Sequence, residues 1–294
     1  MTVMNLVQAM SQRLQAASLA YGHGTTNAWD EAAWLVLWQL GHALDTLDEA
    51  GTLPVESAQQ AEVEALVARR ISTRQPAAYL TGEAWLQGVP FFVDERVIVT
   101  RSLIAEPLAD GTLDAWINPA THRVLDLCTG SGSLAVLAAL AWPEVLVDAS
   151  DLSADALAVA QCNVDRHGLA ARITLHQGDG LAALDVPRRG RYDLILCNPP
   201  YVNQQSMTEL PPEFLAEPRL ALDGNSHGGH DGMDFIRQML AQAGSALNPG
   251  GVLVLEVGHE RAHFESAFRR LDAVWLPTSA GDDQVLLITQ EALV

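Results

Sequence analysis

The sequence predicts an α/β protein in which a small helical region precedes a mostly parallel sheet. From about residue 113 onward, short apolar runs alternate with helical patterns, which is typical of parallel strands joined by crossover helices. The first 95 residues instead show apolar side chains at three-to-four spacing, the period of helices. Hydrophobic residues make up 49% of the 294-residue chain, which is enough for a sizeable core and suggests about two domains.

Three helices are expected in the N-terminal region. The first covers residues 4–19 and ends before the break at residues 21–25. Asn27 is expected to begin the second, with Asp30 three residues on as a capping-box acid. The third covers residues 58–71.

A connecting segment is expected between this region and the sheet. Residues 91–93 and 96–99 are apolar and are expected to form a hairpin or a pair of short strands. The expected domains are a helical domain at 1–90, a hairpin or linker at 91–112, and the α/β domain at 113–294.

The α/β domain is expected to contain five strands with helices between them. The strands are expected at residues 123–127, 144–149, 172–176, 192–197 and 252–257. The helices are expected at residues 133–141, 154–167 and 233–247. A turn at residues 248–251 leads into the fifth strand. After a helix at 260–271, residues 273–276 and 284–289 are expected to pair antiparallel.

The chain is strongly acidic. It carries 36 acidic residues against 17 basic residues, all of them Arg, for a net charge of −19. Such a charge repels the phosphates of nucleic acids and favours a basic partner. The same charge also aids solubility, so the choice between these two interpretations stays open.

Neither a membrane span nor an export signal is expected. No apolar run approaches the roughly 18 residues that a membrane span needs. The first 20 residues carry Gln, Ser and Arg at helical spacing and lack an apolar signal core. We therefore expect a cytoplasmic protein without a membrane partner.

The run Asn198-Pro199-Pro200-Tyr201 follows the expected strand at 192–197. Each proline fixes φ and removes an N–H donor, and the residue before each proline avoids helical conformation. The result is a stiff loop that exposes the Asn198 amide and at least one free carbonyl. These acceptors can hold a planar NH2 group, and open α/β sheets bind ligands at this end of their strands.

A glycine loop follows the expected strand at 123–127. It consists of Cys128, Thr129, Gly130, Ser131 and Gly132. Glycines let the backbone approach a ligand closely, and the following helix offers free N–H donors. Together with Ala135, the loop also matches the pattern of dinucleotide-binding proteins. Asp126 argues against a dinucleotide, because a pyrophosphate site avoids negative charge and a cationic amino-acid ligand favours it.

Two further acids follow strands of the expected sheet. Asp151 lies 19 residues after Gly132, which suits a carboxylate that accepts hydrogen bonds from both ribose hydroxyls. Asp179 is placed to accept from an adenine amino group. A solvated turn acid is the alternative interpretation of Asp179.

No metal site is expected. Cys128, Cys162 and Cys197 form no metal-binding spacing and are interpreted as buried reduced thiols. His227 and His230 are three residues apart, but two glycines lie between them and make a helix implausible. Residues 223–230 are therefore expected to form a flexible surface loop.

The order of these residues resembles class I S-adenosylmethionine-dependent methyltransferases, and Asn198–Tyr201 resembles the enzymes among them that methylate planar NH2 groups. Other motifs are similar to the ribosomal-protein branch of the glutamine methyltransferases, and the similarity covers nearly the whole chain. These motifs are Tyr21-Gly22-His23-Gly24-Thr25, Asn27, Trp29-Asp30-Glu31-Ala32, Pro76-Ala77-Ala78-Tyr79-Leu80-Thr81, Val93-Asp94-Glu95-Arg96-Val97, residues 125–132 and residues 198–202.

The resemblance implies a fold, a cofactor and a substrate. The fold is a Rossmann-like, mostly parallel seven-stranded sheet whose last strand is antiparallel. Asp126, the loop Cys128–Gly132, Asp151 and Asp179 contact S-adenosylmethionine, while Asn198–Tyr201 hold the glutamine and Asn198 also borders the cofactor. The member that the chain most resembles methylates the third protein of the large ribosomal subunit, and the N-terminal helices are expected to recruit this basic partner.

The chain departs from the family pattern in the linker and after Asp179. The family usually has proline where Thr100 and Leu103 stand, so a looser backbone is expected there, while Arg101 and Glu106 keep their spacing. Gly180 replaces a bulkier residue, which weakens any expected side-chain contact with adenine.

Several alternatives stay open. A release-factor glutamine methyltransferase shares the Asn198–Tyr201 loop, although the residues from Tyr21 to Ala32 argue against it. A DNA adenine methyltransferase disagrees with the acidic charge. A nicotinamide-dependent oxidoreductase leaves Asp126 and the Asn198–Tyr201 loop unexplained, and a non-catalytic binding protein with this fold leaves the intact loops unexplained.

Overall fold

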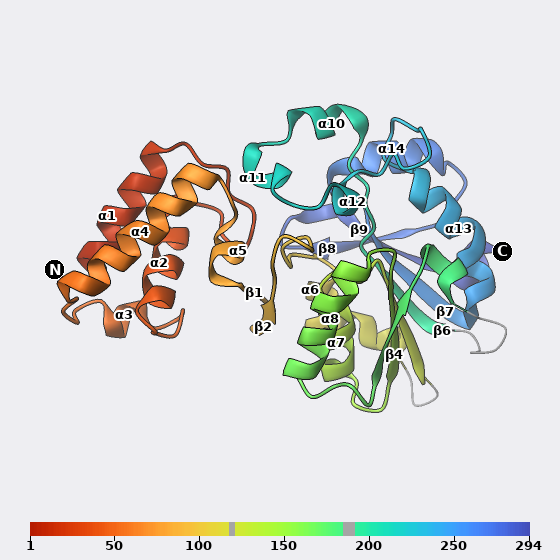
Figure 1. The fold of residues 1–294 in the computed structure, drawn as a ribbon. Coiled ribbons are helices and arrows are strands. Elements are labelled where there is room, and N and C mark those ends of the chain that lie inside the picture. The colour runs from red at the N-terminus through yellow and green to blue at the C-terminus, as the bar shows by residue number, and fades with distance from the viewer. Residues whose placement is uncertain (118–120, 185–191) are drawn as a thin grey trace.

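The computed structural model describes residues 1–117, 121–184 and 192–294. Figure 1 shows a group of helices near the N-terminus set beside a twisted sheet that has helices on both faces. In the described residues, the N-terminal elements are α1 (Val3–Ala16), α2 (Ala28–Gln39), α3 (Leu47–Ala50), α4 (Ser57–Thr73), α5 (Ala77–Thr81), β1 (Glu83–Leu86) and β2 (Val89–Phe92).

The larger part of the chain forms the sheet and its covering helices. Its elements are α6 (Ala105–Ala109), η1 (Thr112–Trp116), β3 (Arg123–Leu127), α7 (Ser133–Ala141), β4 (Leu146–Asp151), α8 (Ala154–Arg166), β5 (Ile173–Gln177), η2 (Gly180–Ala183), β6 (Tyr192–Cys197), α10 (Gln204–Glu209), α11 (Pro212–Leu215), α12 (Arg219–Leu222), α13 (Asp234–Ala246), β7 (Leu247–Glu256), η3 (Gly258–Glu260), α14 (Arg261–Ala267), β8 (Val274–Thr278), β9 (Gly281–Thr289) and η4 (Gln290–Leu293).

The sheet confirms the predicted topology. Among the described residues it has seven strands in the order β5-β4-β3-β6-β7-β9-β8, and β9 runs antiparallel to both of its neighbours, β7 and β8. The predicted bounds of β3, β6 and α7 are those of the structure. Because β3 lies beside β6, with Leu127 paired to Cys197, the loops that follow these two strands meet at one edge of the sheet.

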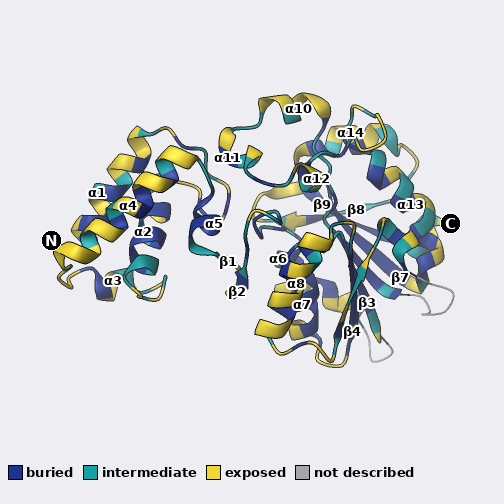
Figure 2. Cartoon of the chain, in the orientation of Figure 1, coloured by how far each residue is buried: buried dark blue, intermediate teal, exposed yellow. Residues whose placement is uncertain are grey.

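The core follows from strand alternation. On β6, Leu194 and Leu196 face the apolar layer that contains α6 and α7, while Ile195 and Cys197 face the layer that contains α13. All four side chains are fully buried. Figure 2 shows the same pattern, with buried strands between helices that are exposed on their outer sides.

The hairpin lies earlier in the chain than predicted. Strands β1 and β2 pair antiparallel, while residues 96–99 form no strand. The turn between the strands contains Gln87 and Gly88, both with positive φ (50° and 74°), which is the geometry of tight hairpin turns. Tyr79 holds residues 94–97 as a turn instead, because its hydroxyl donates to the Val97 carbonyl.

Two other local predictions need correction. The Asn27 side chain caps α2 by accepting from the N–H groups of Trp29 and Asp30, but Asp30 accepts from the Asn27 side-chain amide rather than from its backbone. The turn predicted at 248–251 lies within β7, where the pairing with β6 passes from Leu247 to Val252.

No helix in the described parts of the chain combines the length and the apolar character that crossing a bilayer requires.

Candidate active site

The glycine loop connects β3 to α7 and lies against α8. Gly130 and Gly132 have φ of 55° and 78°, and Cys128 also has a positive φ of 61°. A Cβ at Gly132 would lie 3.1 Å from the Cβ of Ala160 and 3.3 Å from its Cα. Glycine is therefore required here, because the helix backbone leaves no space for a side chain.

Asp126 lies beneath this loop and is 1% exposed. Its Oδ2 accepts from the Thr129 hydroxyl at 2.5 Å and from the Ala135 N–H at 3.0 Å. Its Oδ1 is buried and has no hydrogen-bond partner in the described chain. Burial raises the pKa of Asp126 to about 7, although the two hydrogen bonds act in the opposite direction. The free oxygen can accept from a cationic donor, and the assignment of Asp126 to the cofactor stays a prediction.

Asp151 ends β4 and reaches the glycine loop. One carboxylate oxygen accepts from the Gly130 N–H and the other from the Ser153 N–H, both at 2.9 Å. Burial raises the pKa of Asp151, although these N–H groups oppose the shift. Each oxygen keeps a lone pair that can accept from a ligand hydroxyl.

Asp179 follows β5 and is exposed. Its side chain makes no hydrogen bond to the rest of the described chain, so it is free to accept from a ligand. Phe235 lies beside Gly180, since a Cβ there would be 3.5 Å from the Phe235 ring. Because Gly180 has no side chain, the ring of Phe235 is the apolar group that lies against this position.

The Asn198–Tyr201 loop begins directly after β6, beside the glycine loop. Asn198 is half-buried, and its side-chain amide makes no hydrogen bond within residues 1–117, 121–184 and 192–294. Backbone hydrogen bonds fix the other end of the loop, because Val202 donates to the Leu222 carbonyl at 2.9 Å and accepts from Gly224 at 3.1 Å. The structure thus presents an unpaired amide on a restrained backbone.

Tyr201 packs against the segment that follows β7. A Cβ at Gly258, whose φ is 52°, would lie 2.6 Å from Cε2 of Tyr201. The Tyr201 hydroxyl donates to Glu256 Oε1 at 3.4 Å, and burial raises the pKa of Tyr201 well above its usual value. Glu256 and Gly258, which were not predicted as site residues, therefore hold this ring. A Gly directly after the predicted fifth strand was the available signal for Gly258, whereas Glu256 lies within that strand and had no such signal.

The linker contacts the site through the residues that replace the family prolines. The hydroxyls of Thr100 and Ser131 are 2.9 Å apart, and the Leu103 N–H donates to Glu256 Oε2 at 2.9 Å. A proline could make neither contact. The looser backbone expected from these two substitutions is therefore not what the structure has.

Arg101 and Glu106, which keep their family spacing, fix the linker from both ends. Arg101 donates to both oxygens of Glu217, at 2.6 and 2.7 Å, and Glu106 accepts from Ser279. Glu217 was also not predicted as important, because its partner lies 116 residues away in the sequence.

Hydrogen bonds hold the loop at 223–230, although His227 and His230 are exposed. The Asp234 carboxylate accepts from the N–H groups of His227 and Gly229 at 2.8 and 2.9 Å. This loop is therefore more restrained than predicted. In the described residues, no group of three or more His, Cys, Asp or Glu side chains is placed to hold a metal ion.

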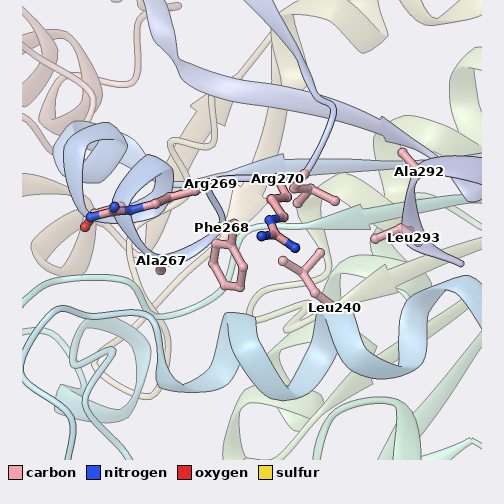
Figure 3. Close-up of a pocket in the computed structure, with 9 residues that line it drawn as sticks. Leu240, Ala267, Phe268, Arg269, Arg270, Ala292 and Leu293 are labelled. Carbon is pink, nitrogen blue, oxygen red and sulfur yellow. The ribbon is translucent and has the colours of Figure 1, made fainter.

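A separate hollow of about 510 Å³ lies between α13, the end of α14 and η4. Figure 3 shows Phe268, Leu240 and Leu293 around it, with the Arg269 side chain pointing away from Leu240. None of its lining residues belongs to the site described above.

Comparison with known proteins identifies the family. The model of the methyltransferase small domain matches residues 111–226. A Bordetella pertussis protein named ribosomal protein uL3 glutamine methyltransferase is 52% identical over 99% of this chain and 96% of its own length. A Neisseria meningitidis serogroup B protein of the same name is 45% identical over 100% of this chain and 94% of its own. The chain belongs to the ribosomal protein uL3 glutamine methyltransferase family.

A solved structure supports the fold of this methyltransferase. The hMettl16 catalytic domain in complex with MAT2A 3'UTR hairpin 1 is 14% identical, covers 87% of this chain and 89% of its own, and has a TM-score of 0.53. At this identity the similarity concerns the fold alone.

Proposed function

We propose that this methyltransferase transfers a methyl group from S-adenosylmethionine to the side-chain amide nitrogen of one glutamine in ribosomal protein uL3. The unpaired Asn198 amide, held at the end of β6 beside the glycine loop, is the observation that carries the proposal. The names of the curated relatives, which are 45–52% identical over nearly the whole chain, support the choice of substrate.

The residues around the glycine loop fit the cofactor. The free Oδ1 of Asp126 suits its ammonium group, and Asp151 suits the ribose hydroxyls. The exposed Asp179 suits the adenine amino group, and the loop Cys128–Gly132 lets the backbone approach. When bound, S-adenosylmethionine supplies a methyl group already activated by a positively charged sulfur, so the protein needs alignment more than acid or base catalysis.

The Asn198–Tyr201 loop aligns the acceptor. An amide nitrogen is a poor nucleophile, because its lone pair is delocalised into the carbonyl. The Asn198 side-chain oxygen and the Pro199 carbonyl accept from the NH2 group, which fixes the nitrogen and raises its electron density. Alignment of this kind contributes up to roughly 7–11 kcal/mol in ideal cases. After methylation the nitrogen loses its proton to the Asn198 oxygen or to water.

The ring of Tyr201, held by Gly258 and Glu256, forms one wall of the amide site. The N-terminal residues 1–90 recruit the protein substrate, and the net charge of −19 favours a basic partner over nucleic acid.

The test compares two purified substrates, uL3 and a peptide-chain release factor, with labelled cofactor and mass spectrometry. We expect the mass of one added methyl group on one glutamine of uL3. We expect Asn198→Ala to lower kcat by about 100-fold, because misplacement of the amide costs that much, and to leave cofactor affinity nearly unchanged. Methylation of the release factor instead of uL3, or an equal loss of turnover and cofactor affinity in Asn198→Ala, contradicts the proposal.

A further inference from the structure

A hollow of about 540 Å³ opens between the short helices that follow the Asn198–Tyr201 loop. These helices, α10 to α12, lie in Figure 1 between the N-terminal helices and the sheet. Its lining is mixed: Met207, Leu215 and Leu222 contribute apolar side chains, and polar and charged residues form the rest. Figure 2 shows exposed residues on α10 and α11, so a large partner can reach this side of the molecule.

One wall of the hollow is joined directly to the amide site. Val202, the residue after Tyr201, exchanges backbone hydrogen bonds with Leu222 at 2.9 Å and with Gly224 at 3.1 Å. The Asn225 side-chain amide also donates to the Val202 carbonyl at 3.1 Å. Leu222 and Asn225 line the hollow, so hydrogen bonds through Val202 join its lining to the loop that is proposed to hold the glutamine.

Another part of the lining rests on the N-terminal signature Tyr21–Gly24. The rings of His23 and Phe214 are in tilted contact with centroids 4.3 Å apart, and a Cβ at Gly22 would lie 3.2 Å from Phe214 Cζ. His23 Nε2 lies 3.4 Å from Glu217 Oε2, and Arg101 binds both oxygens of the same carboxylate. Phe214 and Glu217 line the hollow, so these buried contacts fix its shape before any partner binds.

Exposure and charge indicate which partner fits. Leu215, at the edge of the hollow, is 61% exposed, which leaves an apolar side chain available for contact. Five of the six acidic residues in the segment 201–240 are paired with arginines, so the preference for a basic partner comes from the net charge of the whole chain. The hollow therefore suits an apolar side chain of a polypeptide that this acidic chain attracts.

We propose that this hollow is a specificity subsite for the substrate residues beside the target glutamine, and that the signature Tyr21–Gly24 selects the substrate by shaping its wall. The proposal rests on the proposed function, because it places the polypeptide on either side of the glutamine held by Asn198. It gives the N-terminal signature a role at the site itself, in addition to recruitment.

The test compares two exposed leucines on neighbouring helices. Leu215 lines the hollow, whereas Leu220, which is 50% exposed on α12, does not. Leu215→Arg and Leu220→Arg add the same charge, so their bulk electrostatic effects are matched. We expect Leu215→Arg to raise KM for uL3 by about tenfold, because one leucine contact with the substrate is lost. Its kcat and cofactor affinity should stay within about twofold of the wild-type values. Met207→Trp, which fills the hollow from α10, is expected to act in the same direction.

Equal KM values for Leu215→Arg and Leu220→Arg, together with an unchanged KM for Met207→Trp, would overturn the subsite. A loss of kcat with unchanged KM would also overturn it, because that pattern indicates damage to the amide site. Failure of the proposed function is distinguishable, since the wild-type protein would then transfer no methyl group to uL3.

Discussion

Asp126 is a buried carboxylate with an unpaired oxygen, and its ionisation changes the stability of the protein and its affinity for the cofactor in opposite directions. Its pKa is raised to about 7 by burial, so the folded protein holds a proton that the unfolded chain releases near pH 3.8. Its contribution to stability therefore falls as pH rises from about 4 to about 7. Binding of a cation requires the ionised form, so affinity for the cofactor rises over the upper part of the same range.

We predict that Asp126→Asn removes both pH effects. The dissociation constant for S-adenosylmethionine should rise by about 10- to 100-fold at pH 8, because a hydrogen bond to a charged group is worth about 1.5–3 kcal/mol. The ligand-free variant should unfold at a higher temperature than wild type at this pH. Calorimetric titration and thermal unfolding between pH 6 and pH 8 measure the two effects. The Asp272→Asn variant is the control, since Asp272 is exposed and outside the proposed cofactor site, and an unaltered pH profile in Asp126→Asn contradicts the assigned role.

Gly258 allows the Tyr201 ring to lie against the site. We predict that Gly258→Ala lowers kcat by at least about tenfold, because the new Cβ would stand 2.6 Å from the ring and displace it. Gly250→Ala is the matched control, since Gly250 also has a positive φ, of 77°, but has no atom within 4 Å of the added Cβ. Both variants should lose about 1–2 kcal/mol of stability from backbone strain. Equal kcat values in the two variants would show that the position of the ring is unimportant.

At the scale of elements, the linker between β2 and α6 joins the glycine loop through Thr100. Thr100 and Ser131 are both nearly buried, and their hydroxyls are 2.9 Å apart. We predict that Thr100→Val costs about 1–3 kcal/mol, because it leaves the Ser131 hydroxyl without its partner. Affinity for the cofactor should fall as the glycine loop loosens, while Thr100→Ser, which keeps the hydroxyl, should retain it. Urea unfolding and calorimetry measure the two effects, and equal behaviour of the Val and Ser variants would refute this link.

The elements of the sheet could be predicted because local pattern and tertiary structure agree. Strands such as β3 and β6 are short apolar runs bounded by turn residues, and their burial on both faces explains the runs. The hairpin was misplaced for the opposite reason. The apolar residues Val97 and Val99 pack into the N-terminal core rather than pair as a strand, and β1 is only four residues long.

The site residues that lie at or just after the ends of strands could be predicted from the sequence. The residues that contact segments distant in the sequence could not. Asp126, Asp151 and Asn198 end strands or follow them, so the order of the sheet brings them together. Glu256 contacts Ser102 and Leu103, more than 150 residues earlier, and no local pattern marks it. Such long-range hydrogen bonds depend on the packing of the whole chain.

At the scale of the whole molecule, buried charges join the N-terminal helices to the sheet domain. Arg70 lies in α4 and is fully buried; it donates to Glu31 of α2 at 2.9 Å, and its guanidinium also lies 3.8 Å from Glu213 of the sheet domain. Arg74 donates to Glu213 at 2.9 Å, in the segment that lines the proposed subsite. A buried charge is costly without a partner, so these pairs fix how the two parts of the molecule sit against each other.

Glu217 is the member of this network with the largest consequence for acid stability. Burial alone would raise its pKa, but Arg101 lowers it to about 2. A carboxyl with a depressed pKa contributes stability above its usual pKa of 4.5, and this contribution is lost as pH falls toward 2. We predict that wild type loses about 3 kcal/mol of stability over this range from Glu217.

The variant Glu217→Gln tests this contribution. It should be less stable than wild type at pH 7, because Arg101 loses its charged partner, and it should lose less stability on acidification. Urea unfolding at several pH values measures this, with the exposed Glu209→Gln as control. Parallel acid profiles for wild type and Glu217→Gln would show that the Arg101–Glu217 pair makes no pH-dependent contribution to stability.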